Sequence, residues 1–161
     1  MQLFSTSFQT PVCVLQLCCT DQGLYSVLFV DEASDKVNDE HPLLSSCVAQ
    51  LNEYFSGKRT SFDLPLSPEG TNFQLKAWQI LQDIPFGKTI SYMLMAKQYG
   101  DVKAIRALAS ANGKNKIAII VPCHRVIGTN QSLTGYAGGL WRKKWLLEHE
   151  AKFTAGVQTL F

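Results

Sequence analysis

The sequence predicts an α/β protein of the α+β type, with a small N-terminal α/β domain at residues 1–70 and a C-terminal helix-turn-helix domain at residues 71–161. Strand patterns gather near the N-terminus and helix patterns follow, which is typical of α+β chains. Two prolines and a glycine within residues 65–70 indicate a linker. The charge changes sign nearby: residues 1–71 carry three basic and nine acidic side chains, a balance of −6, whereas residues 72–161 carry twelve and four, a balance of +8. Such a basic half is typical of proteins that bind the phosphate backbone of nucleic acids.

Length and composition favour a folded protein of the cytoplasm. With 161 residues, of which 46% are hydrophobic and 17% charged, the chain is able to bury a real core. No apolar run reaches the length of a membrane span, and the first residues lack the basic and apolar segments of a secretory signal. The five cysteines are odd in number and irregularly spaced, which argues against a disulfide framework or a zinc site. We therefore expect a cytoplasmic protein without a bound metal.

The N-terminal domain is expected to hold a β-hairpin followed by a helix. Residues 12–19 and 24–30 are rich in Val, Leu, Phe and Cys, and they flank Asp21-Gln22-Gly23, a hairpin turn signal. Apolar side chains then recur at helical spacing through residues 42–56, and Gly57 indicates where that helix stops.

Caps and stop signals divide the C-terminal domain into helices. A capping box at residues 71–74 starts a helix that must end near Pro85. Two further helices are expected within residues 91–100 and 101–113, because each begins at a capping side chain and ends at a glycine. A one-glycine turn between two helices is the spacing of a helix-turn-helix. An ordinary pair of amphipathic helices is the alternative.

The remaining C-terminal elements follow from apolar runs. On the helix at 101–113, apolar side chains share one face, whereas Lys103, Arg106 and Ser110 share another face that is able to meet DNA. Five consecutive aliphatic residues at 117–121 predict a buried strand. Residues 140–151 predict a final helix.

Cys123 is the candidate nucleophile, since it follows the predicted strand and precedes His124. A thiolate is a strong nucleophile, and a nearby base or positive charge is what forms it at neutral pH. The other four cysteines fit structural roles as small apolar residues in strands or a helix. Neighbouring side chains of an extended chain point in opposite directions, so direct contact between His124 and Cys123 is not expected and a bridging water is the sensible route.

Residues 122–127, followed by 135–140, resemble the active-site segment of the O6-alkylguanine-DNA alkyltransferases. The resemblance covers residues 72–151 and matches the N-terminal part only in outline. It implies a ribonuclease-H-like N-terminal domain and a winged-helix-like C-terminal domain that carries the active site. The further matches are Phe73-Gln74, Trp78, Ile84-Pro85, Gly87, Ser91-Tyr92, Ala96, Arg106-Ala107, Asn115, Leu146-Leu147 and Glu150.

The function that the resemblance implies is single-use DNA repair. The O6-alkyl group of guanine, and also the methyl group of O4-methylthymine, would pass to Cys123 and leave the protein irreversibly alkylated. Glu150 would orient and charge His124, as the third member of a triad does. Tyr92 would donate a proton to the leaving guanine, and Asn115 would tie the turn before the active site through bonds to backbone. Without the resemblance, Tyr92 and Glu150 would be taken for a core tyrosine and a solvated charge.

The resemblance also implies how DNA is held. Arg106 would fill the stack that the flipped nucleotide leaves, although a phosphate contact is its plainer role. The partner would be double-stranded DNA entered from the minor groove by a monomer, with no cofactor. Arg125 is expected to serve in an internal ion pair rather than in catalysis. The implied DNA-binding residues are Tyr92, Lys103, Arg106, Ala107 and Ser110, and the implied base pocket comprises Cys123, Val126, Tyr136 and Ala137.

Two other functions stay open on the residues alone. A cysteine hydrolase could use Cys123, His124 and Glu150, and a DNA-binding regulator would explain the charge and the helices without the triad. Relatives that bind lesions without repair carry tryptophan at the acceptor position, which Cys123 argues against. The chain departs from the common family pattern at Val102, Lys116 and Gln131, which puts substrate breadth rather than activity in question.

Overall fold

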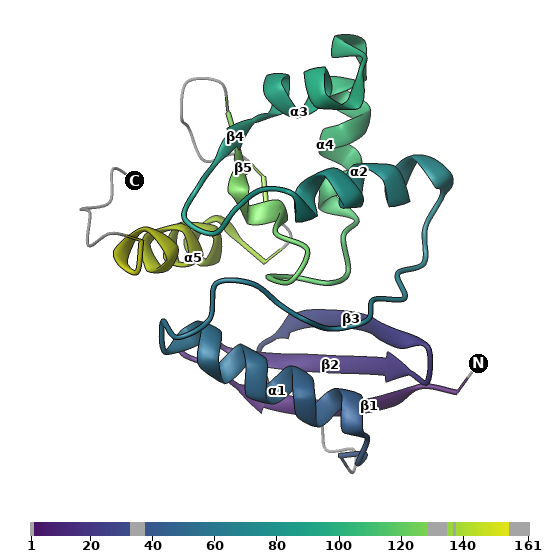
Figure 1. Ribbon diagram of the computed structural model, residues 1–161, viewed down its shortest axis with the longest axis vertical. Helices are drawn as coiled ribbons and strands as arrows, with labels where there is room; N and C mark the ends of the chain where they lie inside the picture. The colour runs from purple at the N-terminus through teal and green to yellow at the C-terminus, as the bar shows by residue number, and fades with distance from the viewer. Residues whose placement is uncertain (1, 33–37, 129–134, 137, 155–161) are drawn as a thin grey trace. The chain divides into compact units, whose positions relative to one another are not determined.

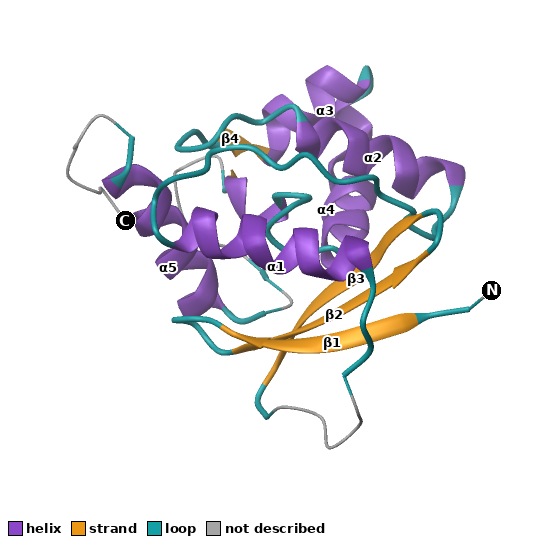
Figure 2. Ribbon diagram, turned by 60° about the horizontal axis from the view of Figure 1, so that its bottom comes forward, coloured by secondary structure: helices purple, strands orange, loops and turns teal. Residues whose placement is uncertain are grey.

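The computed structural model describes residues 2–32, 38–128, 135–136 and 138–154, and the chain forms two compact units (Figures 1 and 2). The first unit contains residues 1–69 together with 116–120, and the second contains residues 70–115 and 121–161. Residues 116–120 therefore belong to the first unit, although they lie in the second half of the chain.

The first unit is a three-stranded antiparallel sheet with one helix on its face. The strands β1 (Phe4–Gln9), β2 (Val14–Thr20) and β3 (Gly23–Val30) are ordered β1-β2-β3, and α1 (Pro42–Phe55) lies across them (Figure 2). The hairpin between β2 and β3 and the helix α1 are confirmed near their predicted bounds. β1 is a strand that the pattern did not predict, because its side chains are mostly polar and only half-buried. Core side chains come from both layers and include Leu15, Leu17, Leu24, Leu44, Cys47 and Leu51.

The predicted strand at 117–121 is wrong. Ile117 makes one isolated parallel bridge to Val27 of β3, and the chain then turns, with Ile119 at a φ of 71°. All five aliphatic side chains are nevertheless buried. A run of apolar residues indicates that the segment is buried, but it does not distinguish a buried strand from a buried irregular turn.

The second unit is mainly helical. It contains α2 (Asn72–Gln82), α3 (Tyr92–Tyr99), the 3₁₀ turn η1 (Val102–Ala104), α4 (Ile105–Gly113), the 3₁₀ turn η2 (Cys123–Arg125) and α5 (Leu140–Lys152). Two short strands, β4 (Ile90–Ser91) and β5 (Val126–Ile127), pair in parallel. The indole Nε1 of Trp78 donates to the carbonyl of Ala111 at 2.8 Å and so ties α2 to α4. Among the residues described in either unit, no helix has both the length and the apolar composition that crossing a membrane requires.

The predicted caps explain where these helices begin and end. Thr71 and Gln74 form both bonds of the capping box at α2. The Ser91 hydroxyl accepts from the backbone N–H of Leu94 at the start of α3, and Gly100 ends that helix in the left-handed region at a φ of 103°. Asp101 caps η1 rather than α4, so the expected third helix starts with a 3₁₀ turn.

Candidate active site

Pairing of β4 with β5 assembles the site from distant parts of the sequence. Ile90 lies opposite Val126, and Ser91 lies opposite Ile127. The residue after β4 is Tyr92, and the residues before β5 are those of η2, which begins with Cys123. The short sheet therefore brings the start of α3 and the turn that carries Cys123 into one region.

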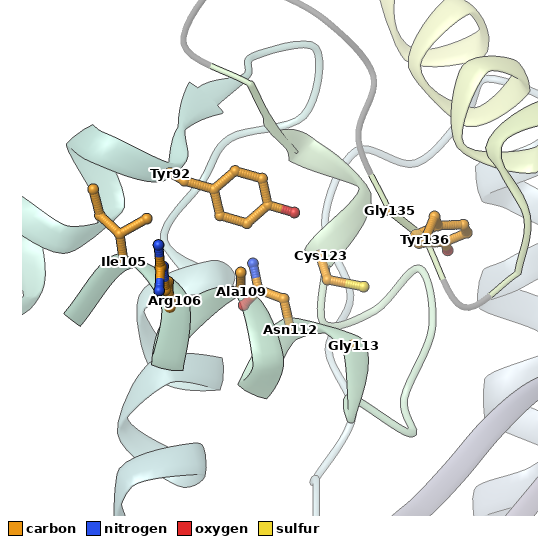
Figure 3. Close-up of a pocket in the computed structure, with 9 residues that line it drawn as sticks. All are labelled: Tyr92, Ile105, Arg106, Ala109, Asn112, Gly113, Cys123, Gly135 and Tyr136. Carbon is orange, nitrogen blue, oxygen red and sulfur yellow. The ribbon is translucent and has the colours of Figure 1, made fainter.

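Tyr92 and Cys123 line a pocket of about 440 Å³. Figure 3 shows the Tyr92 hydroxyl and the Cys123 sulfur above α4, with Arg106 at one end and Tyr136 at the other. Small residues of α4 leave room for a ligand beside the sulfur. The described residues of the lining are Tyr92, Ile105, Arg106, Ala109, Asn112, Gly113, Cys123, Gly135 and Tyr136.

Asn115 contacts the sulfur directly. Its side-chain Nδ2 lies 2.8 Å from the carbonyl oxygen of Val121 and 3.3 Å from Cys123 Sγ. The first bond ties the turn before the active site, as expected, and the second was not expected from the sequence. Burial raises the pKa of the Cys123 thiol, whereas the Asn115 hydrogen bond and the nearby Lys143 ammonium act in the opposite direction.

His124 is fully buried and bonded to Glu150. The distance from His124 Nε2 to Glu150 Oε2 is 2.7 Å. Because an ionised carboxylate only accepts, Nε2 of the neutral ring carries the proton and Nδ1 keeps a lone pair. No described residue forms a hydrogen bond with this Nδ1. Burial lowers the pKa of His124 despite the pull of Glu150, so the ring is neutral at pH 7 and its Nδ1 is able to accept a proton.

A bridging water between Cys123 and His124 was expected from an extended chain at these residues. Cys123 and His124 lie in the 3₁₀ turn η2 and not in extended chain, so the alternation of side chains along a strand does not apply to them. The buried bond between His124 and Glu150 fixes the direction of the ring instead.

Arg125 shares the same carboxylate, in agreement with its expected role in an ion pair. Its Nε donates to Glu150 Oε1 at 2.7 Å, its Nη2 donates to Oε2 at 3.1 Å, and its Nη1 donates to the carbonyl of Ile84 at 2.6 Å. Burial alone would raise the pKa of Glu150, but the His124 ring and the Arg125 guanidinium outweigh it and hold that pKa well below its ordinary range. Glu150 is therefore an ionised, fully enclosed anchor for both side chains.

Lys143 is a functional candidate that the sequence reasoning missed. Its side chain is fully buried in α5, and burial lowers its pKa to about 8. At pH 7 most molecules carry the positive charge, which favours the thiolate form of Cys123. A signal was present, because Lys143 precedes Glu150 by two helical turns and so shares its face of α5. His149 is another polar side chain that α5 buries, and it contacts the rings of Trp145 and Phe153.

The remaining predicted residues fall in two places. Lys103 of η1 and Arg106, Ala107 and Ser110 of α4 are exposed, whereas Leu108 packs inward. Val126 is buried in β5 and does not belong to the described lining of the pocket. Two residues from the sequence analysis, Ala137 and Gln131, lie outside the described part of the chain. Within that part, no group of three His, Cys, Asp or Glu side chains is placed to hold a metal ion.

Two family models match the chain, and the border between them falls where the long first segment of the first unit ends. Residues 116–120 lie within the second model although they belong to the first unit. The model described as "6-O-methylguanine DNA methyltransferase, ribonuclease-like domain" matches residues 3–68, and the one described as "6-O-methylguanine DNA methyltransferase, DNA binding domain" matches residues 72–152.

Individual proteins are similar over most of their length. A methylated-DNA--protein-cysteine methyltransferase of Methanosarcina acetivorans is 42% identical over 153 residues, which cover 92% of this chain and 98% of the relative. Its namesake in Mycobacterium tuberculosis is 52% identical over 117 residues, covering 73% of this chain and 71% of the relative. A crystal structure of the M. tuberculosis protein named OGT, in complex with DNA, superposes with a TM-score of 0.85 at 42% identity, covering 93% of this chain and 94% of that one.

Proposed function

This chain belongs to the 6-O-methylguanine DNA methyltransferase family, and we propose that Cys123 is its alkyl acceptor. The expected family and the two-domain α+β fold are confirmed. The protein repairs DNA directly, by transfer of an alkyl group to one of its own cysteines. One observation carries the choice of cysteine: among the described residues, Cys123 is the cysteine that lines the pocket, whereas the other four lie in the first unit. The substrates we propose are O6-alkylguanine and O4-methylthymine.

The reaction follows from the contacts of Cys123. His124 Nδ1 takes the thiol proton through a water molecule, and the sulfur attacks the alkyl carbon of the lesion. The S–C bond forms as the C–O6 bond breaks, and the bonding pair leaves with the guanine. Tyr92 gives its phenolic proton to that guanine and is later reprotonated, so the net change moves one alkyl group and one proton. No step restores the thiol, and the protein acts once.

Three features support thiolate formation at the moment of attack. Asn115 donates to the sulfur, Lys143 places a positive charge nearby, and Glu150 holds the neutral His124 ring by its Nε2–H. Asn115 and Lys143 oppose the burial that otherwise raises the pKa of the Cys123 thiol. A half-buried sulfur that ionises only with this support is protected from stray electrophiles, which suits an acceptor that is consumed.

The exposed face of α4 supports a DNA contact through the minor groove. Ala107 and Ser110 are small, so a narrow groove is able to approach the helix closely, and Lys103 supplies a charge for the phosphates. Arg106 lies on this face and also lines the pocket, where its guanidinium would fill the gap left by the flipped nucleotide. The active form that we propose is a monomer.

The alkylated nucleobase would be held at the side of the pocket opposite Arg106. Tyr136 lines it, and we propose that Tyr136 and Ala137, with the backbone of Cys123 and Val126, contact the edge of the base. A cytoplasmic location completes the proposal. It is supported by the five cysteines, all of them described, none of which is joined in a disulfide.

The test is the mass of the intact protein after incubation with a duplex that carries one O6-methylguanine. We expect a gain of one methyl group per molecule, located on the peptide that contains Cys123. Cys123→Ala should bind the duplex and gain no mass, whereas Cys18→Ala, a change at a half-buried cysteine of β2, should react like the wild type. Methylation of Cys123→Ala would refute the choice of acceptor, and repeated turnover would favour a hydrolase.

A further inference from the structure

The turn that follows α2 contacts the buried charges of the active site. The backbone N–H of Lys88 donates to the carbonyl of Pro85 at 3.1 Å and closes a four-residue turn. Gly87 occupies its third position with a φ of 80°, which is typical of a type II turn and favours glycine. Ile84-Pro85 and Gly87 belong to the matched sequence pattern, but nothing in the reaction described above uses them.

The backbone of this turn holds both members of the ion pair behind His124. The carbonyl of Ile84 accepts from Arg125 Nη1 at 2.6 Å, and the N–H of Gly87 points at Glu150 Oε1 at 3.4 Å. The Phe86 ring lies 5.8 Å from the guanidinium carbon of Arg125. The carboxylate that orients His124 is thus contacted by this turn as well as by η2.

Gly87 also packs against the end of α5. A Cβ atom at this position would overlap the hydroxyl of Thr154 and would lie 2.9 Å from its Cβ. That hydroxyl donates to the backbone carbonyl of Glu150 at 2.6 Å. Any side chain at residue 87 must therefore displace Thr154, the bond that Thr154 makes to Glu150, or the turn itself.

We propose that the turn at 84–88 is a positioning element of the transfer reaction, in which Gly87 holds the Glu150 carboxylate against His124. This role rests on the function proposed above. Gly87 touches neither the sulfur nor the pocket in the described structure, so it acts through Glu150 and His124 and is a positioning residue. A displacement of about 1 Å in a catalytic group lowers the reaction rate on the order of 10²-fold.

The experiment compares Gly87→Ala, the double variant Gly87→Ala with Thr154→Gly, and the wild type. Single-turnover methyl transfer is measured at saturating duplex from pH 5.5 to 8.5, with duplex affinity measured separately. We expect Gly87→Ala to transfer the methyl group roughly 10- to 100-fold more slowly at unchanged duplex affinity, because the His124 ring is misplaced. The acid limb of its pH profile should also change, since His124 is the group that takes the thiol proton. The double variant should be faster than Gly87→Ala and slower than the wild type only by the several-fold loss that follows from removing the Thr154 hydroxyl, since it lacks the atoms that the new Cβ would strike.

Gly100→Ala is the matched control. Gly100 also has a positive φ, at 103°, but a Cβ there would meet nothing within 4 Å, so this variant carries backbone strain without a clash. It should transfer methyl at the wild-type rate once duplex is saturating. Should Gly87→Ala fail to fold, Thr154→Ala tests the other side of the contact and should be several-fold slower with a shifted acid limb.

Two results would overturn the inference. The first is a wild-type rate and pH profile for Gly87→Ala, or for Thr154→Ala where that variant replaces it. The second is a double variant that transfers methyl as slowly as Gly87→Ala. A failure of the proposed function is distinct from either, because the wild type would then take up no methyl on Cys123.

Discussion

Replacing Lys143 with methionine should make the protein more stable and slower to react. The Lys143 side chain is fully buried, and burial moves its pKa from the ordinary 10.5 to about 8. Each pKa unit corresponds to about 1.36 kcal/mol, so keeping the charge buried at pH 7 costs about 3 kcal/mol of folding free energy. Methionine has a similar length and adapts to the same space without a charge. Lys143→Met should therefore raise the free energy of unfolding by up to about 3 kcal/mol. It should react more slowly, because the Cys123 thiolate loses a nearby positive charge.

The pH dependence of this gain gives the sharpest test. The pKa of Lys143 is lower in the folded protein than in the unfolded chain, so its cost is fully present below about pH 8 and disappears as the pH rises toward 10.5. Urea unfolding of both proteins should show a stability difference at pH 7 that shrinks by pH 10. Lys144→Met is the control, because Lys144 is exposed and its ion pair with Glu148 at 3.8 Å lies on the surface, and it should change stability little. Equal stability of Lys143→Met and wild type at pH 7, or a pH-independent gain, would refute the reasoning.

Three further predictions concern the reaction. Asn115→Ala should lose about 1–3 kcal/mol in urea unfolding and react more slowly in single-turnover assays, because Val121 and the Cys123 sulfur lose a shared donor; unchanged kinetics would contradict its role at the sulfur. Arg106→Ala should slow repair of duplex DNA far more than transfer from the free alkylated base, and equal losses on both substrates would argue against a stacking role. Since the pKa of His124 is lowered, its neutral form should persist below pH 6.5. A transfer rate that decreases on acidification while the pH is still above 6.5 would exclude His124 as the group that takes the thiol proton.

Local chemistry explains which elements could be predicted. The side chains that cap α2 and α3 act on backbone groups within three residues of themselves, so Thr71 and Ser91 identify helix starts without tertiary information. Gly100 ends α3 for the same local reason, since it adopts a left-handed conformation. The strand predicted at 117–121 failed because its apolar run reports burial only.

The residues of the site likewise fall into those that local sequence identifies and those that only the tertiary structure identifies. Cys123 and His124 stand out because the residues that mark them are their sequence neighbours, and Glu150 was found through the spacing of a family pattern. Lys143 was missed, because a lysine in a helix is ordinarily solvated and only the packing around α5 buries it. The bond from Asn115 to the sulfur was likewise missed, because it depends on the turn geometry between residues 115 and 123.

By itself the sequence determined the two-part organisation, most of the helix limits, the basic half and the choice of candidate nucleophile, because charge, capping and motif spacing are properties of nearby residues. The tertiary structure alone decided the electrostatics of that nucleophile. It gathers Arg125, Lys143 and Glu150 out of water around His124 and Cys123, and the pKa of a buried group depends on what surrounds it in space. It also places the turn at Gly87 against Glu150, a contact across 63 residues that no local pattern contains.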